Sequence, residues 1–262
     1  MNGIMLQLEI ILPAMLAGAL ILSTHVPLGR EVLQRGIIFL DLAIAQMAAL
    51  GLVFSHVIGL EGHAPLFDQL IAVTAAIIGA SLLYLVRNAP TRVQEALIGL
   101  LFMLAATGSI LLLARDPHGG ERLRELLVGQ ILWVGYRELI ATAIIYALLL
   151  WFWIRWRARL GSYGFYPVFA VAITLSTQLV GVYLVFASLI IPALASLHLS
   201  RPWISAYGLG LTGYFLGLIL SALFDLPSGA MIAWCLGLTG ILFYLLTRNR
   251  IPSNGQREPS GS

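Results

Sequence analysis

Lysine is absent from the sequence, and cysteine is nearly absent. All 15 basic residues are arginines, so a phosphate-binding loop of the form GxxxxGK[ST], which needs its lysine, does not occur. The one cysteine, Cys235, excludes an intrachain disulfide and a CxxC metal or redox motif. HExxH, GxSxG and GxGD motifs are missing too, which counts against an intramembrane hydrolase. We therefore expect a chain that is not an enzyme and carries no ATPase site.

Charge is also scarce. Charged residues make up 10% of the 262 residues and hydrophobic residues 60%, whereas about 25% of the residues in a soluble protein are charged. This composition indicates a polytopic membrane protein surrounded by lipid. The net charge of +3 is small, and the arginines gather at the ends of apolar runs. The charge therefore bears on membrane orientation, and we expect no nucleic-acid partner.

Long apolar runs dominate what is present. A bilayer core needs about 20 apolar residues per helix, and Gly, Pro and Arg residues divide the chain into eight or nine such runs. The short sixth and seventh runs are compatible with one broken pair. Lipid leaves no partner for open backbone groups, so every run must be helical. The predicted spans are 8–27, 36–59, 66–87, 94–114, 137–154, 165–178, 179–197, 203–223 and 228–247.

These runs predict an all-α bundle of eight or nine helices in one transmembrane domain, residues 1–247. The first run has no basic segment before it, so we interpret it as a membrane helix and not as a signal peptide. The remaining segment, 248–262, is polar and rich in Pro, Gly and Ser. We expect it to be a disordered cytoplasmic tail.

The arginines predict the orientation in the inner (plasma) membrane. An N-terminus outside places eleven arginines inside and four outside, which satisfies the positive-inside rule. The C-terminus is then cytoplasmic. The four arginines outside lie in or beside the loop RDPHGGERLRE, where three acids offset part of their positive charge. They are Arg115, Arg122, Arg124 and Arg137.

One apolar run, GIIFLDLAIAQMAALG, carries Asp41 and Gln46 in its interior. An acid at the centre of a membrane helix costs roughly 2.5 to 3.5 kcal/mol, which is tolerated when it faces a polar cavity or a partner. Helical spacing puts Gln46 about 140° round from Asp41. One interpretation is a carboxylate beside a cation path. The other is an acid near a helix end that snorkels or pairs with Arg35.

The other candidate residues each have two interpretations. Glu95 opens the fourth helix, where the helix dipole favours an acid, or it belongs to the path. His25 and His56 lie towards helix ends and are either metal contacts or imidazoles satisfied locally. His63 and His118 lie in predicted external loops and are candidates to touch an incoming metal or a docking partner.

The stretch LVGVYLVFASLIIPALASLHLSRPW, residues 179–203, changes character at Pro192. A proline removes a backbone hydrogen bond and tends to kink or end a helix. A short amphiphilic segment with His198, Ser200 and Arg201 follows, up to Pro202. The pattern fits a small helix that docks on a partner at the cytoplasmic face, and it fits a turn between two helices equally well.

This stretch resembles the VGxLLVxALLIxPAxxA motif of the permease subunits of ATP-binding-cassette importers for zinc and manganese. Four further stretches resemble motifs of the same family in the same order along the chain. GIIFLDLAIAQMAALG stands where the family has a GDxxxHxxLPG-like motif. EALIGLLFMLAATGSILLL is similar to the fourth-helix region, LLVGQILWV to LFGxILxV, and LFDLPSGAMIAW to the DxPSGA segment.

The resemblance implies a homodimer in the membrane lipid, with each copy over a separate ATPase subunit and supplied by a periplasmic metal-binding protein. It implies that Asp41 and Glu95 are the family's acids. The histidine that the family has four residues after its first acid falls on Ala45, and the nearest polar residue is Gln46. Imidazole suits zinc, whereas carboxylate and carbonyl groups suit manganese, so the metal stays open. The segment from Pro192 to Pro202 would be the coupling helix.

We therefore predict the permease of an importer for a divalent transition metal, Zn²⁺ first and Mn²⁺ or Fe²⁺ next, with no cofactor bound by this chain and with ATP hydrolysed by a partner. Two alternatives are a permease for metal chelates of the siderophore or cobalamin type and a secondary carrier without an ATPase. The candidate metal-path residues are Asp41, Glu95, Gln46 and His56. The candidate coupling residues are Pro192, Ala193, Ser196, His198, Arg201 and Pro202.

Overall fold

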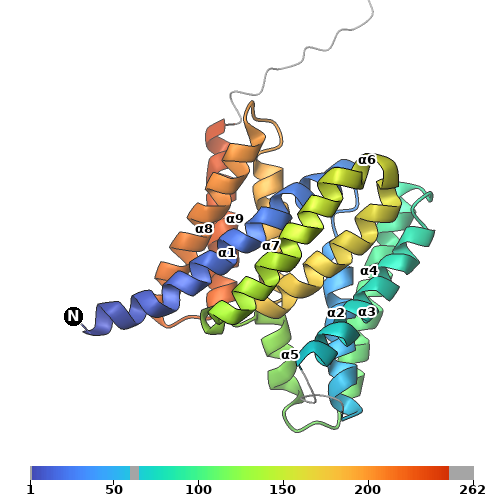
Figure 1. The fold of residues 1–262 in the computed structure, drawn as a ribbon, viewed down its shortest axis with the longest axis horizontal. Helices are drawn as coiled ribbons and strands as arrows, with labels where there is room; N and C mark the ends of the chain where they lie inside the picture. Colours follow the sequence, from blue (N-terminus) through green and yellow to red (C-terminus); the bar gives the residue numbers. More distant parts are fainter. Residues whose placement is uncertain (1, 60–64, 248–262) are drawn as a thin grey trace, which may run out of the picture.

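The computed structural model describes residues 2–59 and 65–247. Within these ranges the chain forms helices and no strands. The predicted tail, 248–262, and His63 lie outside the described residues. Figure 1 shows the arrangement of the helices, which are α1 (Asn2–Arg35), α2 (Leu40–Val57), α3 (Pro65–Leu85), α4 (Thr91–Leu113), α5 (Gly119–Val128), the short 3-10 helix η1 (Ile131–Trp133), α6 (Tyr136–Val180), α7 (Val182–Ala195), α8 (Pro202–Phe224) and α9 (Ser228–Thr247).

Eight helical segments of the described chain are long and apolar enough to cross a bilayer. Two of them are the limbs of α6, which reverses direction at Gly161, where φ is +50°, as Figure 1 shows. The sixth predicted run, 165–178, was too short, because the second limb covers Ala158–Val180. The short run is α7, whose 14 residues extend about 21 Å. The all-α bundle with eight or nine apolar helices is confirmed.

The first helix is longer than the predicted run 8–27, because α1 continues to Arg35. Pro27 lies inside it, and a proline leaves the carbonyl four residues earlier without its helical partner. The hydroxyl of Tyr207 on α8 lies 3.5 Å from that carbonyl, which belongs to Ser23. Membrane helices tolerate proline when a neighbour satisfies the freed group in this way.

The helices form two groups around the second limb of α6. One group consists of α2, α3 and α4, and the other consists of α1, α7, α8 and α9, which lie on opposite sides of the view in Figure 1. The second limb of α6 is the most enclosed span, with 78% of its apolar window buried. Both groups therefore pack on this central helix, and α5 lies at one end of the bundle.

Candidate functional site

Asp41 lies in the first turn of α2 and is buried, with 1% of its surface exposed. Within the described chain, neither of its carboxylate oxygens has a hydrogen-bond partner. Arg35 is not its counter-ion, because the Arg35 guanidinium donates to Glu31 at 2.7 Å and to Ser162 at 2.8 Å. The burial excludes snorkelling in this conformation. Asp41 therefore neither snorkels nor pairs with Arg35.

Gln46 lies on a different face of α2 from Asp41, as the helical spacing predicts. It lines a largely apolar cavity of about 500 Å³ together with Phe102, Tyr183 and Ala187. Its amide is buried, and in the described part of the chain its Oε1 has no hydrogen-bond partner. Asp41 does not line this cavity. The two polar residues of α2 thus face different surroundings.

Glu95, in the first turns of α4, ties this helix to the start of α2. Its Oε1 accepts a hydrogen bond of 2.8 Å from the backbone N–H of Ile38, three residues before Asp41. Its Oε2 is buried without a partner among the residues described. Glu95 therefore holds the backbone from which Asp41 projects, and it does so with one oxygen only.

His56 lies at the opposite end of α2, 15 residues from Asp41 and therefore about 22 Å away along the axis. Its Nε2 is 3.1 Å from Oδ2 of Asp116, and Nε of Arg122 is 3.4 Å from the same oxygen. The backbone N–H of His118 donates to Asp116 at 2.9 Å. This hydrogen bond, with His56 and Arg122 nearby, lowers the pKa of Asp116 below its ordinary value.

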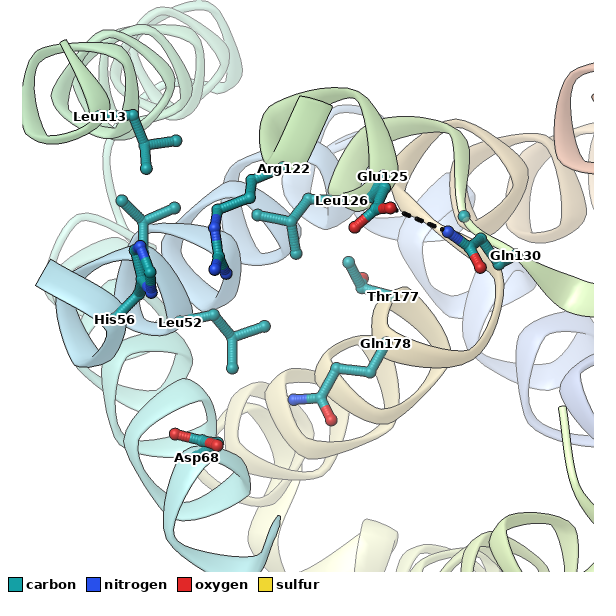
Figure 2. A pocket seen from close by; sticks show the side chains of 12 residues that line it. Leu52, His56, Asp68, Leu113, Arg122, Glu125, Leu126, Gln130, Thr177 and Gln178 are labelled. Carbon is teal, nitrogen blue, oxygen red and sulfur yellow. Dashed lines mark hydrogen bonds between the residues drawn. The ribbon is translucent and has the colours of Figure 1, made fainter. Parts of the chain in front are cut away.

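A polar cavity of about 400 Å³ surrounds His56 at this end of the bundle. Figure 2 shows side chains from α2, α3, α5 and α6 that converge on it. The Gln130 amide donates to Glu125 at 3.1 Å. The sequence analysis did not identify five other polar residues that line this cavity, because isolated polar residues at helix ends form no motif. These residues are Asp68, Glu125, Gln130, Thr177 and Gln178.

The chemistry of the polar cavity suits water and a hydrated ion better than a bare metal. Its lining groups include the guanidinium of Arg122 beside the carboxylates of Asp68 and Glu125. Across residues 2–59 and 65–247, no group of three His, Cys, Asp or Glu side chains is placed to hold a metal ion. The four predicted path residues do not converge either. Asp41 and His56 lie at opposite ends of α2 and Gln46 lies on another face of that helix, whereas Glu95 lies on α4 beside the start of α2.

A junction of backbone segments lies next to residues that line both cavities, since Gly129 lines the polar cavity and Val182 lines the apolar one. Gly129, after α5, has φ +71°, and Gly181, between α6 and α7, has φ +80°. A Cβ on Gly181 would lie 2.4 Å from the nitrogen of Gly129, and a Cβ on Gly129 would lie 2.1 Å from the Val180 carbonyl. Gly229 at the start of α9 also lies against Val128, where a Cβ would be 2.1 Å from the carbonyl oxygen. Three segments of the chain therefore pack together here through glycines.

The predicted coupling helix is a turn. Pro192 lies inside α7, which ends at Ala195, and the turn leads to α8, where Pro202 occupies the first position. Ser196 is buried and its hydroxyl donates to the Pro192 carbonyl at 2.7 Å. His198 and Arg201 are exposed. One half of the segment is therefore anchored in the bundle, and the other half is open to a partner.

The end of α1 contacts the helices on both sides of this turn. The Arg30 guanidinium lies 4.9 Å from the ring centre of Trp203 on α8. Gly29 approaches the Leu189 carbonyl of α7 so closely that a Cβ would lie 2.1 Å from it. Any movement of the turn relative to the bundle must therefore disturb the end of α1.

His25 is buried in α1, away from both cavities. Its Nδ1 is 3.1 Å from the Thr24 hydroxyl. Its Nε2 has no hydrogen-bond partner among the described residues. It belongs to no group of three His, Cys, Asp or Glu side chains in the described residues, so nothing there favours a metal site.

Comparison with known proteins found a matching family model and similar sequences. The model of a family described as "ABC-3: ABC 3 transport family" matches residues 7–160 and 156–247. A Haemophilus influenzae protein named "Probable iron transport system membrane protein" is 32% identical over 136 residues, which cover 43% of this chain and 50% of that protein. A Cyanophora paradoxa protein, "Uncharacterized membrane protein in ycf23-apcF intergenic region", is 27% identical over 199 residues, 67% of this chain and 66% of that protein. The chain spans half to two thirds of these relatives.

Two solved structures share the fold. "PsaBC from Streptococcus pneumoniae in complex with Fab" has a TM-score of 0.69 and 19% identity, over 90% of this chain and 89% of that one. "An inward-facing conformation of a putative metal-chelate type ABC transporter" has a TM-score of 0.64 and 17% identity, over 91% and 85%. At such identities the comparison establishes the fold alone.

Proposed function

Since the chain belongs to the ABC 3 transport family, we propose that it is the permease of an importer that carries a divalent transition metal into the cell. The family makes the chain a multi-span membrane subunit of an ABC transporter for a metal or a metal chelate. The finer assignment is a homodimer in the plasma membrane, with a separate ATPase subunit that hydrolyses ATP and a periplasmic metal-binding protein that delivers the ion.

Asp41 is the observation that carries this proposal. Burial of an ionised carboxylate without a partner is unfavourable by several kcal/mol, and no described side chain offsets that cost. A divalent cation in transit supplies the missing partner. A single carboxylate binds a metal weakly, which suits a path that must release what it accepts.

Three metals remain candidates. The motif resemblance favours zinc, but no imidazole accompanies Asp41, because Ala45 occupies the position of the family's histidine. Carboxylate and carboxamide oxygens suit harder ions such as manganese. The Haemophilus relative is named for iron. We propose zinc first and manganese or iron next, and we propose that the dimer partner completes the ligand shell.

The exposed half of the coupling turn fits a role as the contact with the ATPase. His198 and Arg201 project from the end of the bundle that also carries Arg30, Arg35 and Arg87. By the positive-inside rule this end is cytoplasmic, and the N-terminus is then outside. Closure of the ATPase dimer would move the turn between α7 and α8, and with it the helices next to the apolar cavity.

The test is uptake by proteoliposomes that contain this chain, its ATPase and its binding protein. We expect zinc, manganese or iron to be taken up with ATP, and Asp41→Asn to abolish uptake. Ser109→Ala is the matched control, because Ser109 is equally buried in α4 but bonds only within its own helix, to Ala105. ATP-independent uptake would show a secondary carrier and overturn the proposal.

A permease for metal chelates is the second candidate. The apolar cavity of about 500 Å³ beside Gln46 is larger than an ion needs, and one structural relative is named as metal-chelate type. The same proteoliposomes separate the two functions. If a chelated metal is taken up and the free ion is not, the cargo is the chelate.

A further inference from the structure

A cluster of tyrosines lies at the arginine-rich end of the bundle, between α3 and the second limb of α6. The rings of Tyr84 and Tyr163 have centroids 4.7 Å apart, and those of Tyr84 and Tyr166 are 5.7 Å apart. Figure 1 shows the turn of α6 beside the connection between α3 and α4. Tyrosines gather where membrane helices leave the hydrocarbon, because one end of the side chain is apolar and the other is polar.

Arg87 lies over this cluster. Its guanidinium carbon is 3.9 Å from the centroid of Tyr84 and 5.6 Å from that of Tyr163. One of its N–H groups donates to the Tyr84 carbonyl at 3.2 Å. No carboxylate of the described chain pairs with it. Arg35, by contrast, is neutralised by Glu31. Arg87 is thus a cation held in place by rings, with its charge uncompensated.

The three tyrosines line a cavity of about 160 Å³, and Arg87 lies over two of these lining rings, those of Tyr84 and Tyr163. Its walls are mostly apolar and come from two helices, with Ile77, Ala80 and Ser81 on α3 and Tyr166 and Pro167 on α6. Ser81 and Ile77 are exposed at its side, where lipid surrounds the bundle. The Tyr84 hydroxyl also lines this cavity and is buried without a hydrogen-bond partner in the described residues.

We propose that this cavity binds an anionic phospholipid, with the phosphate on Arg87 and one acyl chain against Ile77 and Ala80. Arginine is the residue that pairs best with phosphate oxygens, and basic pockets between membrane helices on the cytoplasmic side recognise anionic headgroups. The Tyr84 hydroxyl supplies a further donor to the headgroup. The apolar walls distinguish this occupant from a free phosphate ion, which has no chain to bury.

The lipid would bridge α3 and the second limb of α6. Tyr84 lies in the last turn of α3 and Arg87 lies in the turn that follows this helix, whereas Tyr163 and Tyr166 follow the α6 turn at Gly161. A headgroup between them fixes the central helix against the group of α2, α3 and α4. This inference does not depend on the cargo or on the presence of an ATPase.

The test is lipid binding to the purified chain, followed by native mass spectrometry and by thermal unfolding in detergent. The probes are phosphatidylglycerol, phosphatidylcholine of the same chain length, and inorganic phosphate. We expect phosphatidylglycerol to bind tighter than phosphatidylcholine, and Arg87→Gln to weaken it about fivefold, the factor that one basic contact to an anionic surface provides. Arg92→Gln is the control, because Arg92 is exposed at the same end but, unlike Arg87, does not lie over the tyrosine rings that line the cavity.

A second variant tests the apolar half of the site. Ser81→Phe fills the mouth of the cavity from an exposed position and leaves Arg87 unchanged, so we expect it to weaken phosphatidylglycerol binding as well. The proposal fails if Arg87→Gln and Arg92→Gln have equal effects, or if both lipids bind equally. It also fails if inorganic phosphate stabilises the native chain as much as the lipid does, because the site would then bind a free anion.

Discussion

The junction of Gly129 and Gly181 makes the sharpest structural prediction, because a single methyl group there collides with backbone atoms of the facing segment. In Gly181→Ala the new Cβ would lie 2.4 Å from the Gly129 nitrogen and 2.6 Å from the Val128 carbonyl carbon. Backbone atoms cannot rotate away, so overpacking costs about 1 to 3 kcal/mol. The backbone at φ +80° and ψ 161° is nearly exclusive to glycine and adds about 1 to 3 kcal/mol. We expect a loss of about 2 to 6 kcal/mol in unfolding free energy.

The assay is chemical unfolding in detergent micelles, with hydrogen exchange to locate the damage. The control is Gly237→Ala in α9, where no atom lies within 4 Å of the new methyl group and alanine favours a helix. We expect Gly181→Ala to unfold at lower denaturant and to exchange faster around α5 and α7. Equal unfolding midpoints for the two variants would refute the reasoning.

Three further predictions follow from single side-chain contacts. Glu95→Gln keeps an oxygen for the backbone N–H before α2, so it should fold like the native chain, whereas Glu95→Ala should lose about 1 to 3 kcal/mol of stability in the same unfolding assay. Ser188→Ala removes the partner that lies 2.8 Å from the buried Tyr214 hydroxyl and should cost about 1 to 3 kcal/mol. Arg30→Gln removes the cation over Trp203 and should cost about 0.5 to 2 kcal/mol and weaken the stimulation of ATP hydrolysis by cargo.

Each of these has its own control. Uptake measured with Glu95→Gln separates two roles of Glu95, positioning of the backbone and supply of a negative charge. If the path needs the charge, this variant loses uptake although it folds. A double variant with Tyr214→Phe should cost less than the two single changes added together; strict additivity contradicts the contact. Arg155→Gln, an exposed arginine at the same end, should leave hydrolysis unchanged, and an equal effect of the two arginine variants contradicts coupling through Arg30.

The fold was predictable because few backbone conformations are stable in lipid. Apolar runs bounded by Gly, Pro and Arg identify the helices, since their backbone groups must bond within the segment. The ends were less predictable. Pro27 looked like a helix boundary, but Tyr207 compensates for its missing bond through tertiary packing. The sixth run was too short because the chain turns at Gly161, before the predicted start of the run at residue 165.

The candidate site was only partly predictable. The free-energy cost of an acid inside a membrane helix was enough to identify Asp41 as unusual. Helical spacing placed Gln46 on another face of the same helix. The pairing of His56 with Asp116 joins segments 60 residues apart, and no local pattern contains that information. The bond from Ile38 to Glu95 is hidden for the same reason. Neither a charge nor a motif points to a backbone N–H as the partner of an acid.

The central claim is that Asp41 is kept for transport and not for folding. The most direct measurement is unfolding stability and metal uptake determined on the same preparations of the native chain and Asp41→Leu. Removal of a buried charge without a partner is neutral or stabilising for the fold. We predict that Asp41→Leu unfolds at the same or higher denaturant and transports no metal. A variant that is clearly less stable, or one that transports normally, would contradict the account.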